Sequence, residues 1–165
     1  MIIGVISDTH DRQDRVAAAL RRFGAEGVGL VIHCGDITSP ETVYLFAGAP
    51  AHFVLGNCDW HADALRRAVA EIGGTLHEPF GELELGGRRI AWLHGDDARL
   101  KQNLESGGEY DFLFYGHTHR AAEHRTGKTR VINPGALQRV DTPTCGVLDT
   151  GTWEFRRIEV VREEA

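Results

Sequence analysis

The stretch IIGVISDTHDRQDRVAAALRRFG (residues 2–24) contains the pattern that decides the fold. The apolar run 2–7 is typical of a buried strand, and the amphipathic pattern 14–24, which ends at a glycine, predicts a helix. A short buried strand followed by a helix is the first half of a βαβ unit, in which a helix joins two parallel strands.

The rest of the first half of the chain repeats this alternation. Further elements are predicted at 30–35 (strand), 40–48 (helix), 52–56 (strand) and 62–74 (helix). In the second half the pattern changes to hairpins, with elements predicted at 81–95 (hairpin around Gly86-Gly87), 97–106 (helix), 111–116 (strand), 121–133 (hairpin turning at 126–128) and 144–160 (antiparallel pair). We therefore expect an α/β (α+β) fold that is mainly parallel at first and antiparallel later.

Composition limits the possible functions. The chain has 165 residues, 42% of them hydrophobic, no internal repeat and no linker, so we expect a single domain over 1–165. Its net charge of −6 argues against tight binding to nucleic-acid polymers. No run approaches the roughly 20 apolar residues of a membrane helix, and no leader is evident, so we expect no membrane association. Three cysteines without a CxxC pair favour the cytoplasm, and the tail 162–165 is interpreted as solvated.

Polar residues follow the apolar strands with unusual consistency. Five strands end in Asp, Asn or His beside Gly or Ser, in the motifs SDTH (7–10), HCGD (33–36), GNCD (56–59), LHGD (93–96) and YGHTH (115–119). The carboxyl ends of strands in open α/β sheets lie at one edge, where ligands bind. Segments far apart in the sequence are therefore expected to meet there.

The side chains of these motifs are metal ligands by type. Seven of them offer carboxylate oxygen, amide oxygen or imidazole nitrogen: Asp8, His10, Asp36, Asn57, His94, His117 and His119. This set is too large for one tetrahedral zinc ion and too rich in nitrogen for magnesium or calcium. Mixed nitrogen and oxygen donors suit first-row transition ions, and seven donors divide naturally between two ions about 3.5–4 Å apart. Asp36, central in the chain order, is the natural bridge.

The ordered motifs DTH, GD, GNCD, HG and GHTH resemble those of the calcineurin-like metallophosphoesterase superfamily, most of all its small YfcE-type phosphodiesterases. The resemblance implies a four-layer αββα sandwich of two mixed β-sheets flanked by helices, and a centre of two divalent transition-metal ions. Mn²⁺ is the expected ion, with Ni²⁺, Fe²⁺ or Zn²⁺ as alternatives, and a homodimer is possible. Carried over by motif, the first ion would be held by Asp8, His10, Asp36 and His119, and the second by Asp36, Asn57, His94 and His117.

The implied activity is hydrolysis of small phosphodiesters, aryl or nucleotide-like, by a hydroxide that bridges the two ions. Asn57 would help to stabilise the charge that develops on the phosphoryl oxygens. One position departs from the pattern: many superfamily members carry a histidine that protonates the leaving oxygen where this chain has Cys58. A thiol with a pKa near 8.5 is poorly matched to that task, so Asp59 and His61 are candidates to replace it.

Other interpretations remain open. The enzyme is alternatively a phosphomonoesterase or nuclease of the same fold, or a protein-binding scaffold similar to the retromer subunit vacuolar sorting protein 29. Asp8 and Asp36, each taken alone, have the residue type of helix N-caps. His33 is interpreted as a core histidine, and Cys34 and Cys145 as small buried hydrophobic residues.

Overall fold

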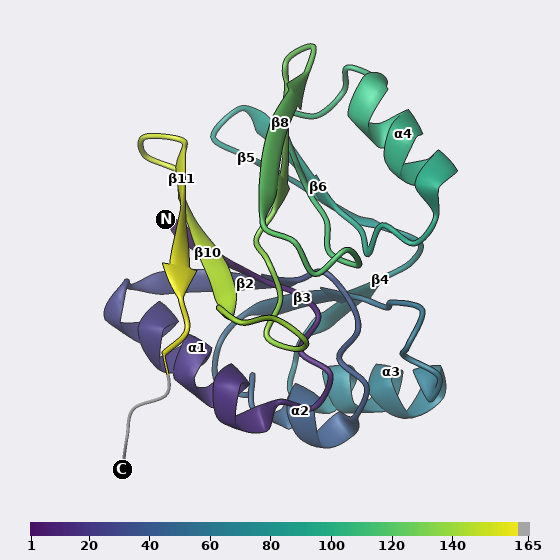
Figure 1. The fold of residues 1–165 in the computed structure, drawn as a ribbon, viewed down its shortest axis with the longest axis vertical. Helices are drawn as coiled ribbons and strands as arrows, with labels where there is room; N and C mark the ends of the chain where they lie inside the picture. Colours follow the sequence, from purple (N-terminus) through teal and green to yellow (C-terminus); the bar gives the residue numbers. More distant parts are fainter. Residues whose placement is uncertain (162–165) are drawn as a thin grey trace.

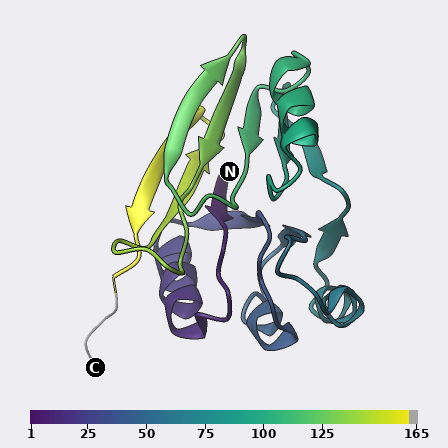
Figure 2. The same ribbon diagram turned by 45° about the vertical axis from the view of Figure 1, so that its right-hand side comes forward.

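The computed structural model describes residues 1–161, and the interpretation of the tail 162–165 falls outside them. Two β-sheets lie face to face, with helices on both outer faces (Figures 1 and 2). The elements are β1 (Ile2–Ile6), α1 (Gln13–Ala25), β2 (Val28–His33), α2 (Pro40–Tyr44), β3 (Ala51–Val54), α3 (Ala62–Glu71), β4 (Thr75–His77), β5 (Gly81–Leu85), β6 (Arg88–Trp92), α4 (Ala98–Ser106), β7 (Phe112–Phe114), β8 (Ala122–Thr126), β9 (Thr129–Asn133), β10 (Thr144–Asp149) and β11 (Glu154–Glu159). The predicted four-layer sandwich is confirmed.

Both sheets are mixed. The first has the strand order β11-β10-β1-β2-β3-β4, in which β1 to β4 run parallel and β10 and β11 are antiparallel additions. The second has the order β5-β6-β7-β9-β8, with a parallel centre between two antiparallel edges. The βα alternation of the first half of the chain thus forms one sheet, and the following hairpins form most of the other.

Three apolar layers hold the sandwich together. The largest side chains between the two sheets include Trp92, Phe112 and Phe114, which pack with residues of the first sheet such as Ile32. A second cluster joins α1, α2 and α3 to the outer face of the first sheet, and a third joins α4 to the second sheet. The strands β1, β2, β3, β6 and β7 are therefore mostly buried towards their carboxyl ends, and the residues that follow them are free to be polar.

Two elements differ from the sequence predictions. The strand β4 was not predicted, because three residues at the edge of a sheet give no readable alternation. The helix predicted over 40–48 is shorter in the structure: α2 ends at Tyr44, and the chain continues in turns as far as Gly48, whose φ is positive (94°). Among residues 1–161, no helix is both long and apolar enough to cross a membrane.

The five polar motifs lie at one rim of the sandwich. The strands β1, β2, β3, β6 and β7 end immediately before or within these motifs. Backbone hydrogen bonds join the loops to one another: Asp8 N donates to Gly35 O (3.1 Å), and Gly116 N donates to His94 O (2.8 Å). His117 N donates to Asp8 Oδ2 (3.1 Å) between the two sheets, so the rim is a connected set of loops from both.

Candidate metal centre

The loops that carry the predicted ligands have a strained backbone. Five of the seven predicted ligands have a positive φ, an uncommon state for residues other than glycine: Asp8 (53°), His10 (40°), Asp36 (58°), His117 (68°) and His119 (56°). Such residues cost about 1–3 kcal/mol each and persist where the surrounding structure fixes them, typically at functional sites. This concentration marks the rim as a functional site.

One group of side chains joins the first strand's loop to the GHTH loop. Asp8, His10, Asp36 and His119 each offer one ligand atom, and these atoms all lie within 4.8 Å of one another. His10 Nε2 lies 3.3 Å from His119 Nε2 and 3.3 Å from Asp36 Oδ2, and His119 Nε2 lies 3.3 Å from Asp8 Oδ1. These are the four residues expected around the first ion.

A second group lies on the other side of Asp36. Asn57 Oδ1 lies 3.0 Å from His94 Nε2 and 3.1 Å from His117 Nδ1, and His94 Nε2 lies 3.3 Å from Asp36 Oδ2. The structure therefore brings all seven sequence-predicted ligands together, and Asp36 lies between the two groups.

The spacing of the donor atoms fits metal ions. Metal–ligand bonds of about 2.1 Å place neighbouring donors of one ion about 3.0–3.4 Å apart, from tetrahedral or octahedral geometry. The 3.3 Å separation of His10 Nε2 and His119 Nε2 lies in this range. Nitrogen and oxygen donors of this kind suit divalent first-row transition ions.

The imidazoles are oriented by their second nitrogen. His94 Nδ1 lies 2.8 Å from Cys34 O, and His119 Nδ1 lies 3.0 Å from Gln138 O. Since a carbonyl oxygen only accepts, each Nδ1 carries the proton, and Nε2 is the atom directed at the cluster. Metal-binding histidines show this arrangement in general.

The electrostatic field at the centre favours positive charge. Burial disfavours the Asp36 carboxylate, but the hydrogen bond and charge of His94 outweigh it and lower the pKa of Asp36 to about 2. Burial likewise disfavours the charged form of His94, yet Asp36 and Asp8 raise the pKa of His94 to about 9. A group that retains its proton this strongly occupies a place where a cation is stabilised.

Two glycines permit the close approach of the loops. A Cβ at Gly116 would lie 1.9 Å from Ser7 Oγ and 2.5 Å from Asp8 Oδ2, and one at Gly56 would lie 2.2 Å from Asp36 Oδ1. Both contacts are far inside van der Waals distance. The glycines of GHTH and GNCD are therefore required because the ligand loops touch there.

Asp59 has a role that the sequence did not indicate. Its Oδ2 accepts from Asp36 N (2.9 Å) and Gly56 N (2.7 Å), and its Oδ1 accepts from Ile37 N (2.8 Å) and Thr38 N (2.7 Å). Burial raises the pKa of Asp59, while these backbone donors oppose the shift. Both oxygens are occupied by the loop of Asp36, so the carboxylate is placed to position that loop. His61, the other candidate acid, is exposed at the N-cap position of α3.

Two more positioning residues escaped the sequence analysis. Ser7 Oγ donates to Asp8 Oδ2 (2.7 Å), and Asn133 Nδ2 donates to Gly116 O (3.0 Å) and Thr118 Oγ1 (3.1 Å). Asn133 belongs to NPGA (133–136), whose composition indicates only a turn. No local pattern could have revealed that its amide fixes the GHTH loop.

Of the simpler interpretations of single residues, one is wrong and the others are confirmed. The N-cap interpretation of Asp8 and Asp36 is wrong, because the cap positions of α1 and α2 are Arg12 and Ser39. His33 is a core histidine as predicted: it is 1% exposed, its Nδ1 accepts from Gly35 N (3.1 Å), and its Nε2 lies 3.1 Å from Thr9 Oγ1. Cys34 and Cys145 are free and buried, as expected for small hydrophobic side chains.

This fold and this cluster together define the class of protein, a metallophosphoesterase. The family model described as the calcineurin-like phosphoesterase superfamily domain matches residues 1–152. A phosphodiesterase of Methanocaldococcus jannaschii is 32% identical over 163 residues, which cover 96% of this chain and 98% of that protein. The chain therefore belongs to the calcineurin-like phosphoesterase superfamily.

Solved structures show the same relationship. An archaeal phosphodiesterase has a TM-score of 0.90 and 32% identity, with 96% of this chain and 99% of that chain covered. The phosphoesterase YfcE of E. coli has a TM-score of 0.69 and 18% identity, with 98% and 100% covered, which shows the shared fold. The resemblance to this superfamily that was read from the motifs is confirmed.

Proposed function

We propose that the chain is a phosphodiesterase that hydrolyses small diesters at a centre of two divalent metal ions. The observation that carries this proposal is the position of Asp36: its Oδ2 lies 3.3 Å from His10 Nε2 and 3.3 Å from His94 Nε2. One carboxylate oxygen thus contacts a donor of each group, as a bridging ligand must. The similarity to a phosphodiesterase of Methanocaldococcus jannaschii along 96% of the chain supports the choice of a diester.

Each group of side chains has its own ion in this proposal. Asp8, His10 and His119 hold the first with Asp36, while Asn57, His94 and His117 hold the second with the same carboxylate. When bound, two such ions supply Lewis-acid stabilisation of phosphoryl oxygens and a water of lowered pKa.

The substrate approaches from the exposed side of the cluster. Asn57 and His117 are exposed there, whereas Asp8, Asp36 and His94 are buried. The side-chain oxygen of Asn57 faces His94 and His117 of the second group. The nitrogen of the same amide, Nδ2, can donate to a phosphoryl oxygen held at the cluster. That donation stabilises charge as it develops in the transition state.

The surroundings of the cluster favour substrates with a stable leaving group. Burial, followed by the charge of Asp36, raises the pKa of the Cys58 thiol, so the thiol is a poor proton donor at pH 7. Asp59 has both oxygens engaged by backbone donors and acts by positioning, not by protonating the leaving oxygen. Aryl diesters, whose leaving group departs with little protonation, should be the better substrates.

Three expectations from the sequence accompany this proposal and stay predictions. Mn²⁺ is the preferred ion, because the donors combine carboxylate, amide and imidazole. A homodimer is possible, on the family resemblance alone. A cytoplasmic location is expected because the three cysteines are unpaired.

The test compares two substrates with the same leaving group. Protein stripped with a chelator is titrated with Mn²⁺, and hydrolysis of bis(4-nitrophenyl) phosphate and of 4-nitrophenyl phosphate is measured along with bound metal. We expect two ions per chain, no activity in chelator, and a higher kcat/KM for the diester. Full activity in chelator, or a plateau at one ion per chain, would contradict the two-metal proposal. Preference for the monoester would contradict the choice of diester.

A further inference from the structure

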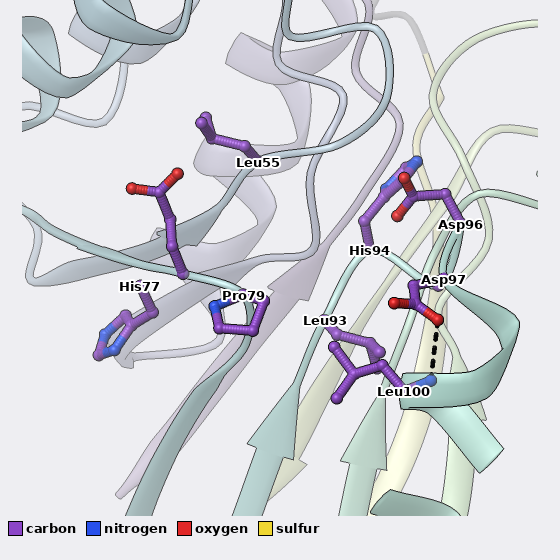
Figure 3. Close-up of a pocket in the computed structure, with 10 residues that line it drawn as sticks. Leu55, His77, Pro79, Leu93, His94, Asp96, Asp97 and Leu100 are labelled. Carbon is purple, nitrogen blue, oxygen red and sulfur yellow. Dashed lines mark hydrogen bonds between the residues drawn. The ribbon is translucent and has the colours of Figure 1, made fainter. Parts of the chain in front are cut away.

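A cavity of about 480 Å³ opens directly beside the candidate metal centre. His94 belongs to both, since it is a member of the cluster and also lines the cavity. Figure 3 shows Leu55, His77 and Pro79 on one side of this space, and Leu93, Asp97 and Leu100 on the other. We call it the side cavity. Its volume lies in the range of small-molecule sites, roughly 300–1,000 Å³.

The walls of the side cavity are largely apolar. Leu55 follows β3, Pro79 follows β4, Leu93 follows β6, and Leu100 lies in the first turn of α4. Both Leu55 and Leu100 are partly exposed, so their side chains are available to a ligand. An aliphatic or aromatic group entering this space would gain about fourfold in affinity for each methylene buried, which corresponds to about 0.8 kcal/mol.

The side cavity carries three carboxylates and two imidazoles, those of His77 and His94. Glu78, Asp96 and Asp97 line it, and no lysine or arginine does so within residues 1–161. Arg66 pairs with Glu78 through two contacts (2.7 and 3.0 Å) and so compensates that charge.

The two aspartates differ in their contacts. Asp97 Oδ1 accepts from Leu100 N (2.9 Å) as the N-cap of α4. Asp96 is exposed and has no hydrogen-bond or ion-pair partner in the described part of the chain. Among the carboxylates that line the side cavity, that of Asp96 therefore has no partner in residues 1–161, and it lies next to apolar walls.

We propose that the side cavity binds one ester arm of the substrate, and that this arm is apolar and carries a positive charge or none. A substituted ammonium group is the preferred end, and arms with a second phosphate or a carboxylate are rejected. This inference rests on the proposed phosphodiesterase function, because it places the substrate's phosphate at the adjoining cluster. It explains how residues of this domain select among diesters.

The test uses three 4-nitrophenyl diesters that differ only in the second arm. The arms are choline (cationic), its neutral isostere 3,3-dimethylbutyl alcohol, and 4-hydroxybutyrate (anionic). Since the leaving group is common to all three, the kcat/KM ratios within one protein report the arm and are independent of metal loading. We expect the cationic arm to exceed the anionic arm by on the order of tenfold, and the neutral arm to fall between them.

A pair of charge variants locates the effect. Asp96→Lys should reduce the ratio of kcat/KM for the cationic arm to kcat/KM for the anionic arm by about tenfold, or invert it. The reason is that the substitution reverses a charge at the side cavity. The matched control is Glu154→Lys, the same charge change on an exposed residue of β11, at the opposite edge of the first sheet from β4. Its ratio should equal that of the unchanged protein.

A binding measurement separates this inference from the proposed function. Phenyltrimethylammonium is titrated into protein loaded with diamagnetic Zn²⁺, and the backbone amide signals of Gly95 and Leu100 are followed by NMR. Saturable shifts that weaken in Asp96→Lys support the site. Hydrolysis without discrimination between arms overturns the inference and leaves the phosphodiesterase proposal standing. Absence of any diester hydrolysis, with ammonium binding intact, overturns the proposed function and leaves the side cavity as a cation-selective site. Absence of both binding and discrimination overturns the site.

Discussion

Replacing Asp59 by asparagine separates a positioning role from a catalytic one. The substitution keeps the shape of the side chain but exchanges one carboxylate oxygen for an NH₂ group. Oδ1 accepts from Ile37 N and Thr38 N, and Oδ2 accepts from Asp36 N and Gly56 N. Whichever way the amide turns, two backbone N–H groups therefore lose their acceptor and meet another donor.

The magnitude follows from these two lost hydrogen bonds. A buried donor left without a partner costs about 1–3 kcal/mol, so Asp59→Asn should lower the free energy of unfolding by roughly 2–6 kcal/mol. That is a large part of the roughly 5–15 kcal/mol that stabilises a typical domain. Because the affected amides belong to the loop of Asp36, the affinity for metal should fall as well.

The assay is urea unfolding at pH 7, combined with measurement of bound Mn²⁺ and of kcat/KM for an aryl and an alkyl diester. Asp63→Asn is the matched control, since Asp63 is 84% exposed in its side chain and pairs only at the surface with Arg66. We expect the control to change stability by less than about 0.5 kcal/mol. If Asp59→Asn were as stable as the control and lost activity only on the alkyl diester, Asp59 would be the general acid and the positioning argument would be refuted.

Three further predictions concern histidines and the cysteine. His119→Ala should release the first ion and His117→Ala the second, while the surface control His124→Ala keeps both. The metal content per chain is measured. Loss of the same ion in both histidine variants would contradict the assignment of His119 and His117 to different ions. Cys58→His should raise kcat/KM for alkyl leaving groups selectively, since proton donation is typically worth about 10²–10⁴-fold; an equal effect on aryl substrates would show that position 58 does not reach the leaving oxygen. Burial lowers the pKa of His33 to about 3, so as the pH falls the imidazole is protonated in the unfolded chain before it is protonated in the folded protein. Stability should therefore fall by about 1.4 kcal/mol per pH unit from pH 6.5 towards 3, and the slope from unfolding curves should shrink by one proton in His33→Asn.

The sequence was sufficient for the parts of the molecule that local patterns encode. Apolar runs located β1, β2, β3 and β6 because the buried parts of these strands are mostly apolar, and Gly86-Gly87 located a hairpin. The motifs also indicated the seven residues that the structure gathers at the rim, but not that their strands belong to two sheets, β1, β2 and β3 to the first and β6 and β7 to the second. The strand β4 was missed because its three residues are held by pairing with β3 and not by any pattern of their own.

What the sequence could not indicate is how the ligand loops are held. Asp59 reaches the backbone of residues that lie 21 to 23 positions earlier in the chain, and Asn133 reaches the GHTH loop from 15 to 17 positions later. Neither contact produces a periodic pattern in the sequence, because each depends on two loops that meet only in the folded structure.

These long-range contacts explain why a strained arrangement persists at the rim. Asp36 and His117 have positive φ values and would relax in a free peptide. Asp36 N is bound by Asp59, Asp36 Oδ1 accepts from Cys58 N (2.8 Å), and His117 N donates to Asp8. Each strained residue is thus fixed by a polar partner on a different loop, and every loop begins at a strand packed in the core. The fold itself brings the donor atoms together, and this preorganisation is what a metal-dependent hydrolase requires of its protein.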